Sequence, residues 1–268
     1  MSKLLLGHDC EAFIKKDNKI ISAHPFLPGT KENPYPVKKG AVLIDGTATE
    51  MNIDPAHSCA EWVANIDTVL GVLQEMLGED KVLCFDPVAH FGYEYLSSLP
   101  KEVTELGCSS DFNAWDVRVN QKPDAAIPFR TAAGHIHFGW LPDLDGEPEN
   151  QMYHQYVAEV VREMDFYLGL PSLLLDTHPD SAQRRALYGK AGCYRPKKYG
   201  MEYRTLSNFW LATKKLKEWA YNAAQDGFAR YESGIRLADK YGDIQSIINT
   251  TDRKAAEKII KAEGLLLV

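Results

Sequence analysis

The sequence has few of the features that stabilise small secreted domains or span membranes. Its 268 residues include five cysteines, and none of them forms a C-x-x-C motif, so neither a disulfide framework nor a zinc site is indicated. The apolar runs are far shorter than the roughly 18 residues of a membrane-spanning helix. The short apolar run after Met1 is also too brief for a secretion signal. We therefore expect a cytoplasmic protein without membrane association and with free or buried thiols.

An excess of positive charge is also missing. The formal net charge is −7, which argues against bulk nucleic-acid binding, because domains that bind nucleic acid by electrostatics are usually basic. The balance of 45% hydrophobic and 25% charged residues is that of an ordinary globular protein. Because no repeat, low-complexity segment or linker divides the chain, we predict one domain over residues 1–268 with intermixed strands and helices.

Hydrophobic periodicity predicts most of the secondary structure. Alternating apolar and polar residues are typical of half-buried strands, and apolar residues three and four apart are typical of helices. We expect Gly78 to end the most regular helix and Asn208 to cap a later one. Strands are predicted over residues 4–15, 20–23, 41–44, 47–53, 81–88, 131–140 and 199–206, and helices over 58–77, 151–168, 208–231 and 244–263.

Four of the predicted strands carry polar side chains two residues apart. Because successive side chains of a strand point to opposite faces, residues i and i+2 share a face. One such pair alone is most often a solvated acid or a hydrogen-bonded core histidine. Four pairs in one sheet would instead form a concave polar face. The pairs are Asp9 with Glu11, Glu50 with Asn52, His135 with His137, and Glu202 with Arg204.

The carboxylates of such a face would not all stay ionised without a counter-charge. Carboxylate oxygens with a little imidazole suit Mg²⁺ or Mn²⁺ better than Zn²⁺. Ions held in this way bridge and neutralise nucleotide phosphates in phosphoryl transfer. The pattern therefore predicts a site for two or more divalent cations.

A basic, glycine-containing segment precedes the last of these strands. Arginine and lysine bind phosphate, arginine through its planar fork, and glycine lets the backbone approach a ligand closely. The Gly189-Lys190 pair does not have P-loop spacing, and a solvated basic loop is the alternative interpretation. The cations of the segment are Arg184, Arg185, Lys190, Arg195, Lys197 and Lys198.

These motifs resemble the amidoligases of the glutamine-synthetase-like superfamily, in particular the type 2 carboxylate–amine ligases of phages and bacteria. The longest and most distinctive match runs over residues 188–208. The resemblance implies an α+β fold with a curved, mainly antiparallel sheet and helices on its outer side, similar to the catalytic domain of glutamine synthetase. The other matching segments are residues 7–11, 45–52 and 134–139.

The resemblance also implies residue roles. It implies ATP held at one end of the sheet by Mg²⁺, with Mn²⁺ as a possible substitute, and it favours His135 over His137 as the metal-binding histidine without deciding between them. Arg204, Arg195 and Lys190 are the candidates for contacts with the reacting phosphate or carboxylate groups. The implied metal ligands are Asp9, Glu11, Glu50, His135 or His137, and Glu202, and the implied ATP contacts are Arg184, Arg185, Lys190, Arg195 and Lys197.

The activity that the resemblance implies is amide (isopeptide-type) bond formation between a carboxylate and an amine, driven by ATP through an acyl phosphate. Small-molecule or peptide substrates are compatible with it, and the location would be the host cytoplasm if a phage encodes the chain. The amine needs a general base, for which Asp111 is one candidate, with a plain loop acid as the alternative. The chain has no counterpart of the N-terminal domain of glutamine synthetase, so its dodecameric assembly and ammonia specificity are not expected.

Two rival functions remain at this point. A metal-dependent hydrolase would use the same acids and histidines and turn over without ATP, but it gives the basic segment no role. A non-catalytic nucleotide-binding protein of the same fold would bind ligand without forming ADP. Nucleotide binding and ADP release distinguish the three functions.

Overall fold

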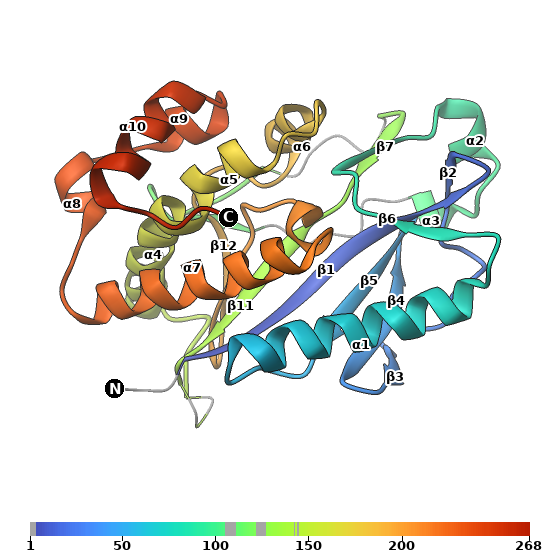
Figure 1. The fold of residues 1–268 in the computed structure, drawn as a ribbon, viewed down its shortest axis with the longest axis horizontal. Helices are drawn as coiled ribbons and strands as arrows, with labels where there is room; N and C mark the ends of the chain where they lie inside the picture. Colours follow the sequence, from blue (N-terminus) through green and yellow to red (C-terminus); the bar gives the residue numbers. More distant parts are fainter. Residues whose placement is uncertain (1–3, 105–110, 122–126, 142, 144) are drawn as a thin grey trace.

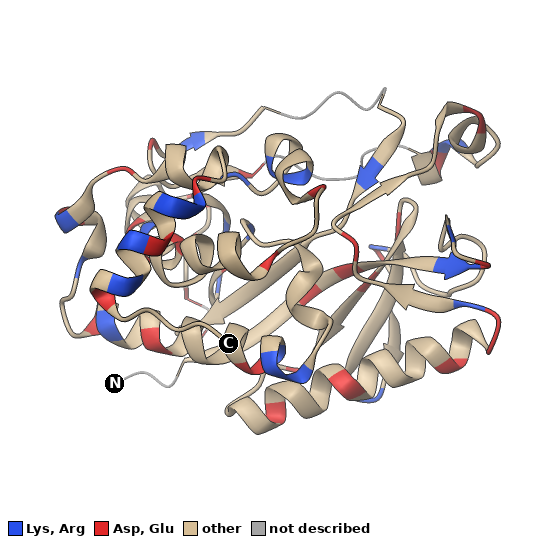
Figure 2. Ribbon diagram, turned by 45° about the horizontal axis from the view of Figure 1, so that its top comes forward, with Lys and Arg blue, Asp and Glu red and all other residues tan. Residues whose placement is uncertain are grey.

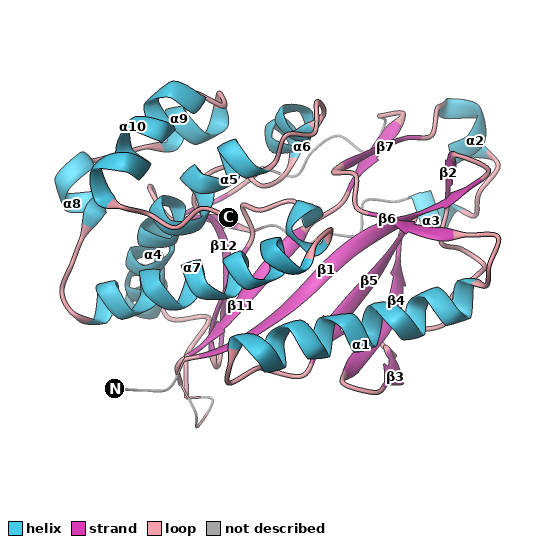
Figure 3. Ribbon diagram, in the orientation of Figure 1, coloured by secondary structure: helices cyan, strands magenta, loops and turns pink. Residues whose placement is uncertain are grey.

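The computed structural model describes residues 4–104, 111–121, 127–141, 143 and 145–268. Figure 1 shows a broad twisted sheet with helices packed along one face, and Figure 3 separates the two kinds of element by colour. The four cysteines within these residues, Cys10, Cys59, Cys84 and Cys193, are free thiols. Cys108 lies outside the described residues.

The main sheet is antiparallel throughout, which confirms the predicted α+β fold with a mainly antiparallel sheet. Within the described residues it has eleven strands in the order β3-β4-β5-β1-β11-β13-β12-β8-β9, with β2 and β6 also paired to β1, and β7 pairs separately with β10. The strands are β1 (Leu5–Lys16), β2 (Lys19–Ile21), β3 (Tyr35–Val37), β4 (Gly40–Asp45), β5 (Ala48–Ile53), β6 (Val82–Cys84), β7 (Val88–His90), β8 (Phe112–Asn113), β9 (Arg118–Val119), β10 (Phe129–Thr131), β11 (Gly134–Gly139), β12 (Cys193–Lys197) and β13 (Gly200–Tyr203).

The register of the central strands brings the predicted polar residues together. In an antiparallel pair, directly opposed residues share a face and lie close together. Strand β1 lies between β5 and β11, and β13 follows β11, so four of the predicted polar strands are neighbours. The opposed residues are Asp9 with Asn52 and His135, Glu11 with Glu50, and Glu202 with His137 and Arg195.

The other face of the sheet is apolar and is covered by helices. Alternate residues such as Leu6, Ile136 and Met201 are fully buried in the main core. Helix α1 packs against β4 and β5, α4 packs against β12 and β13, and α7 packs against both helices (Figure 1). The α-helices are α1 (Cys59–Leu77), α2 (Tyr93–Ser97), α3 (Lys101–Thr104), α4 (Gln151–Met164), α5 (Leu170–Leu175), α6 (Ser181–Leu187), α7 (Lys214–Glu232), α8 (Leu237–Tyr241), α9 (Gln245–Asn249) and α10 (Arg253–Glu263).

Helix α1 begins and ends as the sequence predicts. The Ser58 side chain accepts a hydrogen bond from the Glu61 amide, and Gly78 ends the helix with a φ of 76°. A serine N-cap satisfies an amide that has no partner within the helix, and a glycine tolerates the positive φ of the last turn.

The prediction that Asn208 caps the long helix is wrong. Residues Asn208–Leu211 form a short 3₁₀ helix, and α7 begins after Thr213, whose side chain accepts a hydrogen bond from the Leu216 amide. The Asn208 side-chain amide instead donates to the Glu11 carbonyl at 2.9 Å. This hydrogen bond links the segment that follows β13 to strand β1.

Three further segments differ from their predictions. Part of the basic segment, predicted as a loop, is strand β12, because it pairs with β13 and β8. The helix predicted to end at residue 168 continues through a π-helical turn, Asp165–Gly169, into α5. The predicted C-terminal helix is split between α9 and α10, because Thr251 has a φ of 59° and Asp252 caps α10.

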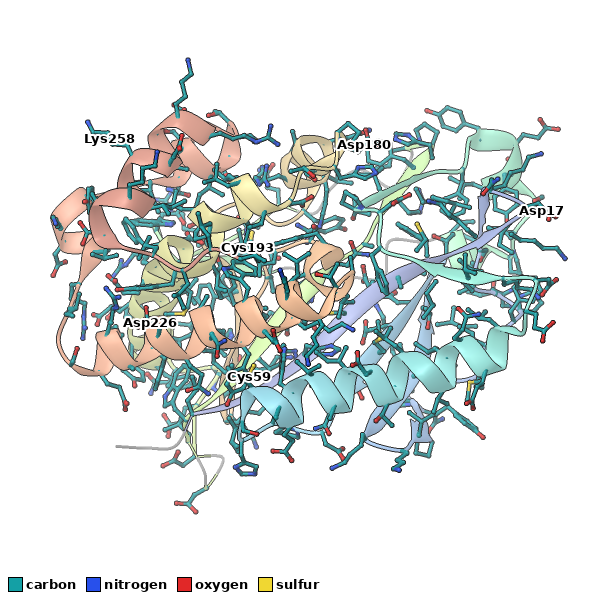
Figure 4. The ribbon with its side chains drawn as sticks, viewed as in Figure 1. Asp17, Cys59, Asp180, Cys193, Asp226 and Lys258 are labelled. Carbon is teal, nitrogen blue, oxygen red and sulfur yellow. The ribbon has the colours of Figure 1, made fainter. Side chains whose placement is uncertain are left out.

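Strand β1 spans much of the molecule. Figure 4 labels Asp17 at the tip of the β1–β2 hairpin, at the right edge of the view, and Cys59 at the start of α1, below and left of the centre. Figure 2 shows acidic positions on the central strands, whereas many basic positions lie on the surrounding helices and loops. No helix among the described residues is long and apolar enough to cross a membrane.

Candidate active site on the polar face of the sheet

The first group of metal-ligating atoms comes from three neighbouring strands. His135 Nδ1 lies 3.0 Å from Asp9 Oδ1 and 3.3 Å from Glu202 Oε1. The side chains of His135 and Glu202 are 8% and 0% exposed, so the group is shielded from solvent. One imidazole nitrogen and two carboxylate oxygens within 4.8 Å of one another form a donor set that fits a divalent cation.

A second group of ligand atoms lies beside the first. Glu11 of β1, Asp45 at the end of β4 and Glu50 of β5 place one carboxylate oxygen each within 4.8 Å of one another. Lys31 approaches Asp45 at 2.8 Å, and Glu11 accepts a hydrogen bond from the Ala133 amide at 2.8 Å. Three carboxylates with one nearby lysine leave an excess of negative charge, which a hard cation would balance.

The pKa values of Glu11 and Glu50 reflect this excess of negative charge in the second group. Burial, followed by repulsion from Asp45, raises the pKa of Glu11 to about 7. Burial, followed by repulsion from Asp9 and Glu11, raises the pKa of Glu50 well above its usual value. Such shifts are expected where carboxylates share a site without a counter-charge, so the second group also fits a bound cation.

The first group is electrostatically different. Burial by itself raises the pKa of Asp9, but the charges of His137 and His135 outweigh it and hold that pKa well below its usual value. Burial, and then Arg204, lowers the pKa of His135 to about 4. A neutral imidazole is the form that binds metal, so the pKa of His135 suits a ligand near neutral pH.

Cations from β12 and β13 surround Glu202. Arg204 Nη1 contacts Glu202 Oε1, Lys197 Nζ lies 2.8 Å from Oε2, and Arg195 Nη1 lies 3.6 Å from Oε1. Burial and Asp9 act to raise the pKa of Glu202, but Arg204 and the two histidines lower it to about 2. The alternation of β12 and β13 brings these predicted residues to one place, because Arg195 and Glu202 are directly opposed.

The remaining predicted residues are placed differently. Arg184 lines a small cavity with Glu11 and Arg204. Lys190 is exposed, and its backbone carbonyl accepts a hydrogen bond from Thr205. Arg185 donates to Thr251 at 2.7 Å, away from the polar face. The phosphate contacts of Lys190 and Arg185 stay predictions.

His137 is part of a different contact from His135. Its Nε2 lies 3.2 Å from Asp9 Oδ1, and its Nδ1 lies 2.7 Å from the Tyr199 hydroxyl. The Tyr199 and His137 rings are stacked with centroids 5.9 Å apart. His137 is therefore held between Asp9 and Tyr199, and it does not belong to the first ligand group.

Three adjoining cavities lie along the polar face. The apolar pocket, of about 640 Å³, shares Asp9 and Glu50 with the central cavity, of about 250 Å³. The central cavity in turn shares Glu11, Asp45 and Arg204 with the arginine cavity, of about 60 Å³. The apolar pocket is lined mainly by Leu5, Ile53, Pro55, Trp140, Leu141 and Tyr199, and the arginine cavity contains Arg130, Arg184 and Arg204.

The sequence reasoning missed three residues of this arrangement. Asp45 lies between the predicted strands 41–44 and 47–53, and its place in the tight β4–β5 hairpin, three residues before the start of β5, puts it on the face of Glu50. Tyr199 and Arg130 lie outside the polar pairs, and no spacing pattern marks them. The hairpin register of β4 and β5 is the signal that would have identified Asp45.

Comparison with known proteins indicates which class of protein this chain resembles. Residues 125–233, less than half of the chain, match the family model described as phage phiEco32-like COOH.NH2 ligase-type 2. This match confirms the resemblance to the type 2 carboxylate–amine ligases that the motifs indicate. The matched segment contains His135, Glu202 and Arg204.

Among solved structures, the chain is similar to a crystal structure of a novel glutamine synthase homolog. The two share 14% sequence identity with a TM-score of 0.44, and the match covers 97% of this chain and 63% of that chain. This chain therefore spans less than two thirds of the length of that relative. No curated protein sequence matches the chain.

Proposed function

We propose that this chain is an ATP- and Mg²⁺-dependent ligase that joins a carboxylate to an amine through an acyl phosphate. The observation that carries the proposal is the position of the two ligand groups, side by side between an apolar pocket and a cavity that contains arginines. The match of residues 125–233 to a carboxylate–amine ligase family supports this reaction class.

The apolar pocket is the proposed site of the nucleoside. Its volume of about 640 Å³ lies within the range of small-molecule pockets, and Tyr199 and Trp140 offer aromatic surface to a base. Arg195 and Lys197, both next to Glu202, are the proposed contacts of the phosphates. The triphosphate would then extend from the apolar pocket into the central cavity.

The two ligand groups are the proposed Mg²⁺ sites, with Asp9, His135 and Glu202 in one and Glu11, Asp45 and Glu50 in the other. When bound, Mg²⁺ would neutralise the phosphate oxygens and so make the γ-phosphorus accessible to an anionic nucleophile. Mn²⁺ fits the same oxygen and imidazole donors.

The reaction has two proposed steps. An oxygen of the substrate carboxylate attacks the γ-phosphorus, a new P–O bond forms, and the bond to the β-phosphate oxygen breaks to release ADP. The amine nitrogen then attacks the acyl carbon, a C–N bond forms, and the C–O bond to phosphate breaks. The amine loses a proton, for which Asp111, which lines the arginine cavity, remains the candidate acceptor. Arg204, held by Asp111 and Glu202, orients the carboxylate for attack.

The first test is release of ADP and phosphate from Mg²⁺-ATP with pooled carboxylates, amino acids and polyamines. We compare the wild type with Glu11→Gln and Glu202→Gln, and use Lys198→Met as a control, because Lys198 is an exposed lysine of the same basic segment to which no role is assigned. ADP release that requires both a carboxylate and an amine, and that both glutamate variants lose, supports the ligase. Absence of ATP binding in the presence of Mg²⁺ contradicts it, and turnover without ATP would favour a metal-dependent hydrolase.

A further inference from the structure

The β12–β13 turn (residues 197–200) carries two side chains of the proposed nucleotide site. Lys197 Nζ lies 2.8 Å from Glu202 Oε2, and the Tyr199 hydroxyl lies 2.7 Å from His137 Nδ1. Tyr199 also lines the apolar pocket. The position of this turn therefore determines where a bound nucleotide would meet both side chains.

Tyr153 of α4 reaches both ends of the turn with one hydroxyl. Its Oη lies 2.7 Å from the Lys197 carbonyl oxygen and 3.0 Å from the Gly200 carbonyl oxygen. Lys197 ends β12 and Gly200 begins β13, and the two residues are directly opposed in the register. The single hydroxyl hydrogen is shared between two acceptors, so Tyr153 links the turn to a helix that packs against the sheet.

The other two carbonyls of the turn accept hydrogen bonds from backbone amides. The Tyr199 carbonyl accepts from the amides of Trp140 and Leu141 at 3.0 and 3.1 Å, and the Lys198 carbonyl accepts from the Gly146 amide at 3.0 Å. Together with the hydroxyl on α4, these amides give every carbonyl of the turn a donor. Loops run over the surface and are usually mobile, whereas these hydrogen bonds hold the turn in one position.

The contact between α4 and the turn is closely packed. A Cβ at Gly146 would lie 2.6 Å from the Tyr153 hydroxyl and 2.7 Å from the Lys198 carbonyl oxygen. Gly200 has a φ of +142°, and a Cβ there would lie 2.2 Å from the Phe138 carbonyl oxygen. Only glycine allows the backbone to approach this closely at both positions, so the sequence is adapted to the contact.

We propose that Tyr153 is a positioning residue of the nucleotide site, whose hydroxyl holds the β12–β13 turn so that Lys197 and Tyr199 are in place before the nucleotide binds. The inference rests on the proposed function and adds to it a residue that acts through the turn, since Tyr153 lines neither the apolar pocket nor the central cavity. A segment that is ordered in advance loses less conformational entropy on binding, so the contact strengthens nucleotide binding.

The ring and the hydroxyl of Tyr153 can be tested separately. The ring packs against the main core, with its centroid 6.5 Å from that of Tyr156, whereas the hydroxyl contacts the turn. Tyr153→Phe therefore keeps the packing and removes the contact. A net intramolecular hydrogen bond of ordinary strength corresponds to about a threefold to tenfold change in an equilibrium constant.

The test is calorimetric binding of a non-hydrolysable ATP analogue in the presence of Mg²⁺. We expect Tyr153→Phe to bind the analogue about threefold to tenfold more weakly than the wild type. In the protein without nucleotide, amide hydrogen exchange of the turn, measured by mass spectrometry, should be faster in the variant. Unchanged affinity or unchanged exchange of the turn in folded Tyr153→Phe overturns the inference.

A double-mutant cycle shows whether Tyr153 acts through the turn. If Tyr153 positions Lys197, the loss of affinity in Tyr153→Phe combined with Lys197→Met is smaller than the product of the two separate losses, because the second change removes the side chain that the first misplaces. A combined loss equal to the product contradicts this route. A change of overall stability alone would not produce the coupling.

Tyr231→Phe is the matched control. The Tyr231 hydroxyl lies 3.3 Å from Glu159 Oε2, so the variant also removes a tyrosine contact with α4, but not one with the turn. It should change thermal stability without changing the affinity for the analogue. An equal loss of affinity in Tyr231→Phe and Tyr153→Phe would contradict a role specific to the turn.

A second variant reaches the same contact from another segment. Gly146→Ala places a Cβ against the Tyr153 hydroxyl and the Lys198 carbonyl, so it should also weaken binding of the analogue. If far-UV circular dichroism shows that Tyr153→Phe is not folded, unchanged affinity of folded Gly146→Ala overturns the inference. Equal binding by the wild type and the folded variants leaves the ligase proposal intact, whereas no binding of the analogue by the wild type overturns both.

Discussion

At the scale of single residues, Glu202 makes more contacts with cationic groups than any other carboxylate of the described residues. It is fully buried and lies between Arg204, Lys197 and His135. Removing one member of a buried charge cluster leaves the others uncompensated, at a cost of about 3 to 5 kcal/mol. We therefore expect Glu202→Gln to lower the free energy of unfolding by about this amount in urea titrations, besides abolishing activity.

The matched control for that variant is Glu163→Gln. Glu163 is also buried, but its carboxylate accepts hydrogen bonds from the backbone amides of Leu237 and Ala238. A glutamine keeps one of these acceptors and leaves no cation behind, so the loss should be clearly smaller. Equal losses in the two variants would contradict the role assigned to the cations around Glu202.

Asp165 gives the protein a pH-dependent stability outside the proposed active site. Burial raises the pKa of Asp165 to about 7, although Trp115 and Tyr203 donate hydrogen bonds to it. Because the folded-state pKa is raised, the folded state holds the proton more tightly than the unfolded state, and the stabilisation present below pH 4 is lost as the pH rises towards 7. For one proton, the free energy of unfolding falls by at most about 1.4 kcal/mol per pH unit between pH 5 and 7.

Asp165→Asn removes this titration. Chemical unfolding at pH 5, 6, 7 and 8, with EDTA present throughout, should give a flatter profile for the variant than for the wild type. Other carboxyl groups contribute to both profiles, so the difference between them isolates Asp165. Identical slopes would show that Asp165 is ionised in the folded protein at pH 5.

Site residues were predictable from the sequence where they stand two residues from another polar residue on a predicted strand. Asp9, Glu11 and Glu202 appear as i, i+2 neighbours of other polar residues, and the structure brings them together. Asp45 and Arg130 were not predictable in this way, because their positions follow from a hairpin register and from a separate strand pair.

At the scale of elements, the turn between α6 and β12 depends on one glycine. Gly189 has a φ of +79°, and a Cβ there would meet Arg184 Nη1 at 2.1 Å and the Thr205 carbonyl oxygen at 2.7 Å. Backbone strain of this type costs about 1 to 3 kcal/mol. We expect Gly189→Ala to lower the midpoint of urea unfolding.

Gly71→Ala is the matched substitution. Gly71 lies inside α1, and a Cβ there would have no heavy atom within 4 Å. Alanine in a helix interior stabilises by about 0.5 to 1 kcal/mol relative to glycine, so the midpoint of urea unfolding should rise. A decrease for Gly71→Ala, or no change for Gly189→Ala, would contradict these two assignments.

The elements were predicted best where local chemistry determined them. Helix α1 has its serine cap and its terminal glycine within the helix and its flanks, so its bounds follow from local sequence. The basic, proline-containing sequence of β12 does not by itself favour a strand. The strand forms because β13 and β8 pair with it on either side. Asn208 looked like a cap, but its partner is Glu11, 197 residues away in the chain.

At the scale of the whole molecule, cation binding should stabilise the fold. The second ligand group joins β1, β4 and β5 through three carboxylates that repel one another. A ligand at a hundred times its dissociation constant stabilises the folded state by about 2.7 kcal/mol. We therefore expect Mg²⁺ and Mn²⁺ to raise the melting temperature by several degrees in differential scanning fluorimetry.

EDTA should reverse this shift, and Glu50→Gln should reduce it while raising the melting temperature of the metal-free protein, because a repelling charge is removed. Glu61→Gln, near the start of α1, serves as the control, since Glu61 belongs to neither ligand group. A melting temperature that does not respond to either ion would contradict the assignment of the second group.

Strand β1 contributes one carboxylate to each ligand group, and this has a consequence for the spacing of the two centres. Asp9 and Glu11 stand two residues apart on a strand that is hydrogen-bonded on both sides, so their separation is roughly 6.6 Å along the strand. The strand acts as a fixed spacer that no single side-chain change can lengthen. One residue inserted after Cys10 would turn Glu11 towards the helices, and a two-residue insertion would restore its face with a longer spacing. The spacing of Asp9 and Glu11 along the strand is therefore determined by the backbone pleat, and every variant that keeps this strand keeps that spacing.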